Sequence, residues 1–515
     1  MESGRDFQLA ARHFQSGRHA EAEEICRELL ARNQNDVEAL NLLGILLARR
    51  GEWGPAIEFY QRAIGLRPDV AEIIRNRGNA QVQLGQFEAA IESYRRVIQL
   101  RPDYFEVLFD LGNVLTRHGR FDEAIAAYRQ AIALRPDSAE TLSNLGNALR
   151  EKGELDEAFA ACRRATAIRP DFSDAYNNLG TVLEDKGEMD GAIAAFRRAI
   201  SLRPSSAKFH WNLARALLAS GRLEEGWEEF EWRLRVGWMK LDRGFSQPAW
   251  NGEAIADRTL LIHTEGGFGD ALNFVRLVPL VSGRAGKVIL ECQPELLRLF
   301  GQVAGVDQII GRGESLPAFD FRIAFQSLPR MLGLRLETIP NSVPYLRAPG
   351  EIADHWRGRL HRDGKINVGL CWAGSRGDMK ARTRTIDVYS RLGRISGARF
   401  FSLQKSPEGN QKPPEEMELI DYTGELNDFA DMAGLTENLD LVISVDTSIA
   451  HLAGALGKPV WVLIPHRSDF RWLMDREDSP WYPTMRLFRQ KRGGNWDEVA
   501  ERIGRALETR VGEMG

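Results

Sequence analysis

The first 240 residues repeat with a period of 34 residues, and this period restricts the possible folds more than any other feature of the chain. Three residue types recur in phase, namely prolines at Pro68, Pro102, Pro136, Pro170 and Pro204, glycines at Gly44, Gly78, Gly112, Gly146 and Gly180, and alanines at Ala56, Ala90, Ala124, Ala158 and Ala192. A small residue lets two antiparallel helices approach closely, whereas proline cannot continue a helix. The spacing predicts stacked helical hairpins, five of them well formed between about residues 37 and 206, with a degenerate hairpin on either side.

The period and the residue types resemble the tetratricopeptide repeat, a helix–turn–helix unit. We therefore expect an all-α superhelix over residues 1–240. One polar position shares the period, at Asn76, Asp110, Asn144, Asn178 and Asn212. It falls on the first helix of each repeat, which usually lines the concave side of such arrays. These side chains could hold an extended peptide, as in the asparagine ladder of the O-GlcNAc transferases that they resemble, or they could join neighbouring repeats or face water.

Composition gives little support to several classes of protein. The formal net charge is -4 and no long basic block occurs, so general nucleic-acid binding is not indicated. The four cysteines lie far apart, without a pattern of metal ligands or paired cysteines. The N-terminus lacks the apolar core of a signal peptide, and no run of 18 apolar residues occurs. These features predict a soluble protein of the reducing cytoplasm.

Beyond residue 240, strand-like segments alternate with helical ones. The stretch 241–257 is rich in Gly, Pro and polar residues and is typical of a connector. The predicted strands are 259–263, 287–291, 321–325, 366–372, 399–403, 439–445 and 459–464. Alternation of this kind favours parallel sheets with crossover helices. We expect two such domains, 258–350 and 351–515.

A glycine-rich turn follows the first predicted strand. Gly266, Gly267 and Gly269 precede a helix, and Asp270 stands at the turn. Backbone N–H groups at such a turn can face a ligand. The carboxylate could act in acid–base chemistry, or it could merely cap the helix.

A second motif follows the buried strand that ends at Val445. Asp446, Thr447 and Ser448 begin a helix that bears His451 one turn later. Hydroxyls and exposed N–H groups at a helix N-terminus suit a diphosphate, although helix capping alone would also explain Asp446 and Ser448.

Together, the segments GGFGD and SVDTSIAHLAGALGKPV resemble the family 9 glycosyltransferases, the bacterial heptosyltransferase group. The resemblance implies a GT-B fold, in which two Rossmann-like domains face a cleft and the C-terminal one holds a nucleotide-sugar without a metal. It also implies that Asp270 is the general base, that Thr447, Ser448 and His451 contact the diphosphate, and that Asp446 lies near the sugar. The absence of a D-x-D motif in a strand–loop context agrees with metal independence. No cofactor is expected besides the nucleotide-sugar substrate.

Other polar residues are candidates for the donor site. Lys380 and Arg384 lie in a basic loop that resembles the family's phosphate-binding loop, although such loops are often merely solvated. Gln404 and Lys405 follow the next strand and could contact the nucleotide. The segment 469–490, rich in Trp, Tyr and Arg, is either a loop beside the cleft or a structural patch.

Three hypotheses follow. The chain is an inverting glycosyltransferase whose repeats present a protein acceptor, or the same enzyme acting on a lipid-linked or polysaccharide acceptor. Alternatively, it is a repeat adaptor with a vestigial transferase domain. Repeat arrays often self-associate, so a homo-oligomer is possible in each case.

Overall fold

The structure is a computed structural model that describes residues 2–239, 241, 243–360, 363–374, 384–405, 411–466, 468–491 and 495–513. Contacts between Cα atoms divide the chain into two units, Met1–Ser205 and Ser206–Gly515. Each unit is described by itself below.

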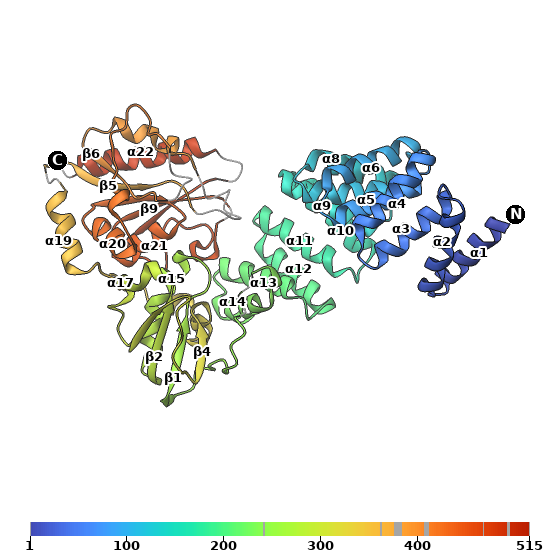
Figure 1. Ribbon diagram of the computed structural model, residues 1–515. Helices are drawn as coiled ribbons and strands as arrows, with labels where there is room; N and C mark the ends of the chain where they lie inside the picture. The colour runs from blue at the N-terminus through green and yellow to red at the C-terminus, as the bar shows by residue number, and fades with distance from the viewer. Residues whose placement is uncertain are drawn as a thin grey trace. The chain divides into compact units, whose positions relative to one another are not determined.

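The first unit is a tetratricopeptide superhelix, coloured blue to teal in Figure 1. Within its described residues, twelve helices form six antiparallel pairs, and each pair packs against the next. The helices are α1 (Glu2–Gln15), α2 (His19–Arg32), α3 (Val37–Arg49), α4 (Trp53–Leu66), α5 (Ala71–Gln83), α6 (Phe87–Leu100), α7 (Phe105–Arg117), α8 (Phe121–Leu134), α9 (Ala139–Lys152), α10 (Leu155–Ile168), α11 (Ser173–Lys186) and α12 (Met189–Leu202). The predicted helical repeats are confirmed.

The recurring glycines are explained by the residue that each one faces. A Cβ atom on Gly78 would stand 2.7 Å from the ring of Tyr94, and one on Gly180 would stand 2.6 Å from the ring of Phe196. Each aromatic side chain belongs to the second helix of its pair and is buried. The absent side chain therefore lets an aromatic ring pack directly on the backbone of the first helix.

The second unit begins with one further helical pair, α13 (Ala207–Ala219) and α14 (Leu223–Phe230). Trp227 and Phe230 of this pair share a hydrophobic core with Leu260 and Phe274 of the α/β region. The last repeat therefore belongs to the same compact unit as the sheets that follow it.

The first sheet contains four parallel strands in the order β3-β2-β1-β4. They are β1 (Ile255–His263), β2 (Ala285–Cys292), β3 (Gln308–Gly311) and β4 (Phe321–Ala324). The associated helices are α15 (Phe268–Phe274), α16 (Val278–Ser282), α17 (Leu297–Phe300) and α18 (Leu328–Met331). β1 begins at Ile255, inside the stretch that the sequence predicted as a connector, and the short β3 was not predicted.

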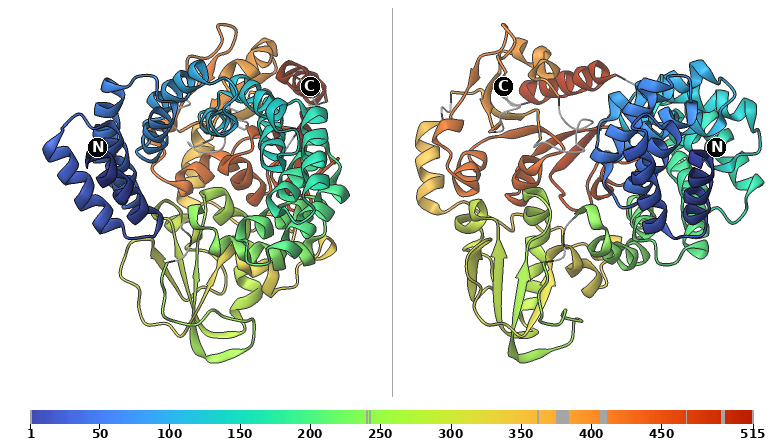
Figure 2. Two further views of the ribbon diagram at one scale, coloured as in Figure 1. Left: turned by 90° about the vertical axis from the view of Figure 1, so that its right-hand side faces the viewer. Right: turned by 45° about the vertical axis from the view of Figure 1, so that its right-hand side comes forward.

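The second sheet contains six parallel strands in the order β10-β9-β8-β5-β6-β7. Figure 2 shows its orange to red strands apart from the yellow-green strands of the first sheet. They are β5 (Ile366–Cys371), β6 (Ala398–Ser402), β7 (Leu419–Ile420), β8 (Leu441–Val445), β9 (Val460–Ile464) and β10 (Met485–Arg489). The helices are α19 (Gly350–Arg359), α20 (Phe429–Glu437), α21 (Ser448–Ala455) and the terminal α22 (Trp496–Gly512). The α/β prediction is confirmed, but β7 and β10 were missed, β10 because arginines interrupt its apolar residues.

Both sheets reverse the direction of winding next to their first strand. In the first sheet the chain adds β2 and β3 on one side of β1 and then β4 on the other. In the second sheet it adds β6 and β7 on one side of β5 and then β8, β9 and β10 on the other. Ligands of open parallel sheets bind at the carboxyl ends of the strands beside such switch points.

Candidate functional site

A cavity of about 570 Å³ within the second unit is lined by residues that follow these strands. The lining includes nine of the predicted site residues, namely Gly267, Gly269, Asp270, Gln404, Lys405, Asp446, Thr447, Ser448 and His451. Two motifs that are far apart in the sequence therefore meet in one cavity. Arg384 is not among the lining residues, and Lys380 lies outside the described part of the chain.

The glycine-rich turn is built so that two helices can approach each other. Gly266 has a φ of +73°, and a Cβ atom there would collide with the carboxylate of Asp270. A Cβ atom on Gly269 would stand 2.9 Å from the Cδ2 atom of His451. The lack of a side chain at Gly269 therefore lets the start of α15 pack against α21, which brings Asp270 and His451 into the same cavity.

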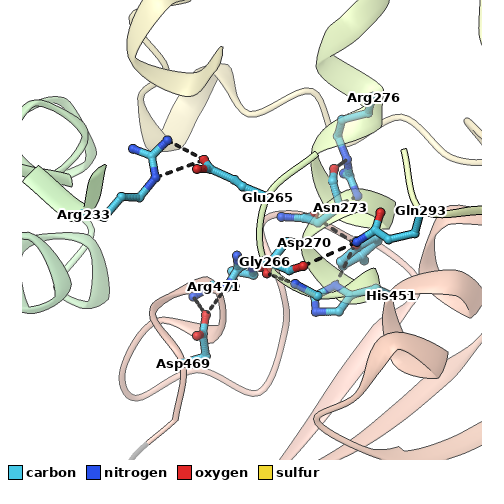
Figure 3. Close-up of polar contacts among 12 residues, drawn as sticks. Arg233, Glu265, Gly266, Asp270, Asn273, Arg276, Gln293, His451, Asp469 and Arg471 are labelled. Atoms are coloured by element: carbon cyan, nitrogen blue, oxygen red, sulfur yellow. Dashed lines mark hydrogen bonds and ion pairs between the residues drawn. The ribbon is translucent and has the colours of Figure 1, made fainter. Parts of the chain in front are cut away.

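Both carboxylate oxygens of Asp270 have partners (Figure 3). Oδ2 accepts a hydrogen bond from the backbone N–H of Gly267 at 3.0 Å, and Oδ1 is paired with Nη2 of Arg471. Arg471 also donates to Oδ1 of Asp469 at 2.7 Å and lies over the ring of Phe470. Burial alone would lower the pKa of Arg471, but Asp469 and Asp270 outweigh burial and raise it.

The second motif forms the opposite side of the cavity. Thr447, rather than Asp446 or Ser448, is the N-cap residue of α21, and its hydroxyl lies 3.1 Å from the hydroxyl of Ser444. Asp446 is buried, whereas Ser448 is partly exposed. The N-cap position of α21 is therefore Thr447, between the two residues that the sequence suggested as caps.

The side-chain amide of Gln404 forms hydrogen bonds with the neighbouring loop after β5. Its Oε1 atom accepts from the backbone N–H groups of Trp372 and Ala373 at 2.9 and 2.7 Å, and its Nε2 atom donates to the carbonyl of Ala373 at 2.9 Å. Gln404 thus shapes the wall of the cavity after β5. Lys405 lines the cavity with an exposed side chain.

Arg384 occupies a different environment from the one that the resemblance implies. Its guanidinium lies 4.1 Å from the ring centroid of Trp496, at the start of α22, and burial lowers its pKa. Its backbone N–H donates to the carbonyl of Trp372 at 2.8 Å. Arg384 therefore anchors the chain between β5 and α22.

The ladder positions of the repeats are half-buried and bond to adjacent repeats. Asn76 donates to Oδ1 of Asn41 at 3.3 Å, Asn144 to Oδ1 of Asn113 at 2.8 Å, Asn178 to Oγ of Ser143 at 2.9 Å, and Asp110 accepts from Arg75 at 3.1 Å. These four contacts each join two successive repeats. Asn212 is also half-buried and lies on α13, in the second unit.

Sequence reasoning missed a buried ionic cluster that supports the glycine-rich turn. Arg233, which is 1% exposed, donates to Oε1 of Glu265 at 3.0 Å (Figure 3). It also donates to Oε1 of Glu231 and to Oγ of Ser327, each at 2.8 Å. Glu265 directly precedes Gly266, so the segment after the last repeat holds the turn in place. A charged residue near the end of a repeat array gives no sequence signal of this role.

Arg471 was also missed as an individual residue. It lies in the segment 469–490, whose unusual content of Trp, Tyr and Arg did mark it in the sequence. The segment is a loop beside the cavity in its first part, where Asp469 and Arg471 line the cavity. It is structural in its last part, where Met485–Arg489 forms β10.

The comparisons with known proteins bear mainly on the repeats. A model of the cilia and flagella-associated protein 70 C-terminal domain matches residues 5–208, and a tetratricopeptide repeat model matches residues 207–226. The protein FlbA of Caulobacter vibrioides is 28% identical over 323 residues, which cover 56% of this chain and 53% of FlbA. The chain thus spans about half the length of this relative.

Two solved structures that this chain is similar to are YrrB and MamA. YrrB is described as a tetratricopeptide protein with an unusual peptide-binding site, and it is 22% identical with a TM-score of 0.33. The match covers 36% of this chain and 95% of the YrrB chain. MamA of Desulfovibrio magneticus RS-1, solved from residue 41 to its end, is 21% identical, with a TM-score of 0.32. The match covers 33% of this chain and 96% of the solved MamA chain. Within the described residues, no helix combines the length and apolar character needed to cross a membrane.

Proposed function

We propose that the α/β region is an inverting glycosyltransferase of the GT-B type, which moves a sugar from a nucleotide-sugar donor to an acceptor. The observation that carries this proposal is a cavity lined both by Asp270, after β1, and by Thr447, Ser448 and His451, after β8. Two parallel sheets that direct their switch points to one cavity suit a donor on one sheet and an acceptor on the other. The volume of about 570 Å³ lies in the range of small-molecule sites.

In the proposed reaction, Asp270 accepts the proton of the acceptor hydroxyl. The acceptor oxygen forms a bond to the anomeric carbon of the sugar, and the nucleoside diphosphate leaves with the electron pair of the broken bond. Oδ1 of Asp270 is paired with Arg471, so the base must first be released. Phosphate oxygens compete well for a guanidinium, and we propose that the donor diphosphate draws Arg471 from Asp270.

The leaving diphosphate needs positive charge close by. Arg471 and Lys405 both line the cavity and can supply it. We propose that such side chains, rather than a metal ion, stabilise the leaving group. Lys380 remains a candidate for the same role.

We further propose that the acceptor is a protein bound by the repeats, and that the chain works in the cytoplasm. All four cysteines, Cys26, Cys162, Cys292 and Cys371, are buried and unpaired, as in proteins of reducing compartments. One observation favours the second candidate, a lipid-linked or polysaccharide acceptor. Asn76, Asp110, Asn144 and Asn178 already bond between repeats, so a peptide would have to compete for them.

Donor binding is tested first, by thermal unfolding with a panel of UDP-, GDP-, ADP- and CMP-sugars. A donor at 100 times its Kd should stabilise the folded protein by about 2.7 kcal/mol. Ser448→Ala should reduce the shift, whereas Ser201→Ala, an exposed serine of α12, should leave it unchanged. If no donor shifts the unfolding of a well-folded sample, the adaptor hypothesis gains the advantage.

Chemistry is tested by turnover once a donor is known. Asp270→Asn should lower kcat by about 10²–10⁴-fold, because it removes the proton acceptor. It should not weaken donor binding, because it also loosens the ion pair that Arg471 must leave. Asp257→Asn, an exposed aspartate of β1 outside the cavity, is the matched control. Full turnover in Asp270→Asn would show that another group is the base.

A further inference from the structure

A chain of four buried polar side chains ends at His451. Arg276, Asn273, Tyr482 and His451 are each no more than 6% exposed. Nη2 of Arg276 lies 3.3 Å from Oδ1 of Asn273, the hydroxyl of Tyr482 lies 2.9 Å from the same Oδ1 atom, and Nδ1 of His451 lies 2.9 Å from that hydroxyl. This relay of four side chains connects α15 and the residues just after it with α21, through Tyr482 in the segment before β10. Figure 3 labels Arg276, Asn273 and His451.

Arg276 determines that the amide oxygen of Asn273, and not its nitrogen, lies beside Arg276 and Tyr482. A guanidinium has only donors, so the amide atom beside it must be the oxygen. Arg276 is itself held by Nε, which donates to the carbonyl of Asn273 at 2.9 Å, and by Nη1, which donates to the carbonyl of Trp481 at 2.5 Å. Its guanidinium carbon lies 4.4 Å from the ring centroid of Tyr482.

Tyr482 then has one arrangement that satisfies its neighbours. Its hydroxyl has a single proton, which must point to Oδ1 of Asn273, because two oxygens 2.9 Å apart without a proton between them would repel each other. Burial raises the pKa of Tyr482 well above its ordinary value, so the phenol keeps this proton. The oxygen of Tyr482 is left as an acceptor, and Nδ1 of His451 must donate to it.

We propose that this relay holds neutral His451 in the Nδ1–H tautomer, so that Nε2 accepts a hydrogen bond from a hydroxyl group of the bound ligand. Nε2 would stand 3.6 Å from a Cβ atom on Gly269, and His451 lines the cavity. A neutral imidazole in this tautomer cannot donate from Nε2 to a phosphate oxygen. The ligand half of the proposal rests on the proposed function, since it identifies the group at this subsite as a sugar hydroxyl rather than the diphosphate.

The tautomer is measured directly by solid-state ¹⁵N NMR of the full-length protein labelled at its nine histidines. At about pH 8.5 an ordinary histidine is neutral, and the two ring nitrogens give separate shifts for N–H and bare nitrogen. His451→Gln assigns the signals by subtraction. We expect a protonated Nδ1 in the wild type, and a protonated Nε2 there would overturn the relay.

Two variants separate the relay from ordinary packing. Tyr482→Phe removes the acceptor of Nδ1, so we expect His451 to populate both tautomers. Tyr345→Phe is the matched control. Its hydroxyl lies 2.6 Å from Nη2 of Arg276 and 3.5 Å from the hydroxyl of Tyr482, but it donates to the carbonyl of Leu272 at 2.8 Å and does not contact His451. An unchanged tautomer in Tyr482→Phe, or a changed one in Tyr345→Phe, would contradict the proposal. If Tyr482→Phe does not fold, the wild-type spectrum still decides.

The ligand half is tested with UDP-, GDP- and ADP-glucose against UDP, GDP and ADP. Tyr482→Phe should weaken the nucleotide-sugar by roughly threefold to tenfold, the effect of one hydrogen bond, and leave the nucleoside diphosphate unchanged. Equal weakening of both would assign His451 to the diphosphate and overturn this half. If no nucleotide binds although Nδ1 is protonated, the proposed function and the ligand half fail while the relay stands.

Discussion

The repeat array and the cavity of the second unit are built from contacts of very different range in the sequence. In the array, the hydroxyl of Tyr128 bonds to Asn113, 15 residues away, and Arg135 pairs with Glu106, 29 residues away. At the cavity, Arg471 contacts Asp270 across 201 residues of sequence, and behind His451 the hydroxyl of Tyr482 contacts Asn273 across 209. A repeat contacts only its neighbours, so one local rule builds the whole array. The cavity instead depends on the position of every element between its residues.

The largest expected effect tests this contrast at the buried cluster of the second unit. Arg233→Leu should destabilise the protein by about 3–5 kcal/mol, because it leaves the buried carboxylate of Glu265 without its partner. Denaturation in urea, followed by tryptophan fluorescence, measures the loss. Arg330→Leu is the control, since its pair with Glu228 is 36% and 62% exposed and should contribute less than about 1 kcal/mol. Similar losses in both variants would mean that burial does not distinguish the two pairs.

The next prediction tests the local rule of the array. Gly180→Ala should destabilise by about 1–3 kcal/mol, because its Cβ atom would stand 2.6 Å from the ring of Phe196. Gly191→Ala, in the following helix, meets Leu183 only at 3.4 Å and should stabilise by roughly 0.4–1 kcal/mol, since alanine favours a helix. Thermal unfolding measures both. Equal signs at the two positions would refute the packing rule.

A third prediction concerns His263, buried at the end of β1. Burial, reinforced by Arg243, Arg322 and Arg312, lowers its pKa to about 3 from the ordinary value of 6.5. Between these values the unfolded chain binds a proton that the folded protein rejects, so stability falls as the pH falls. His263→Leu should remove this dependence. As the pH falls from 6.5 to 5, the free energy of unfolding of the wild type should decrease by about 2 kcal/mol relative to that of the variant. A constant difference across this range, measured by urea denaturation at each pH, would contradict the lowered pKa.

The smallest effect is expected for the ion pairs on the surface of the array. Arg135 and Glu106 lie 2.6 Å apart, but their side chains are 53% and 38% exposed. Arg135→Gln should therefore cost roughly 0.2–1 kcal/mol, and about 1 M salt should reduce the difference from the wild type. A loss as large as that of Arg233→Leu would remove the distinction between the two regions.

Prediction from sequence succeeded where a pattern maps to one local structure. The period of Pro68 and Gly44 predicts the hairpins, and the apolar run before Val445 predicts β8. It failed for β10, whose arginines hide the apolar face, and for the four-residue β3. At the site, the motifs predicted Asp270, His451 and Gln404, and the structure brings all three to one cavity, where their roles stay predictions. Arg384 lies instead over Trp496, outside the lining.

By itself, the sequence determined the helical array, the two parallel sheets and the two motifs, because each depends on the chemistry of residues close together in the chain. Only the tertiary structure decided which distant groups meet. It paired Asp270 with Arg471, joined the ladder residues between repeats and linked Arg276 through Asn273 and Tyr482 to His451. The physical reason is that a hydrogen bond or ion pair forms only within about 3–4 Å, and nothing local in the sequence encodes the approach of residues 200 positions apart.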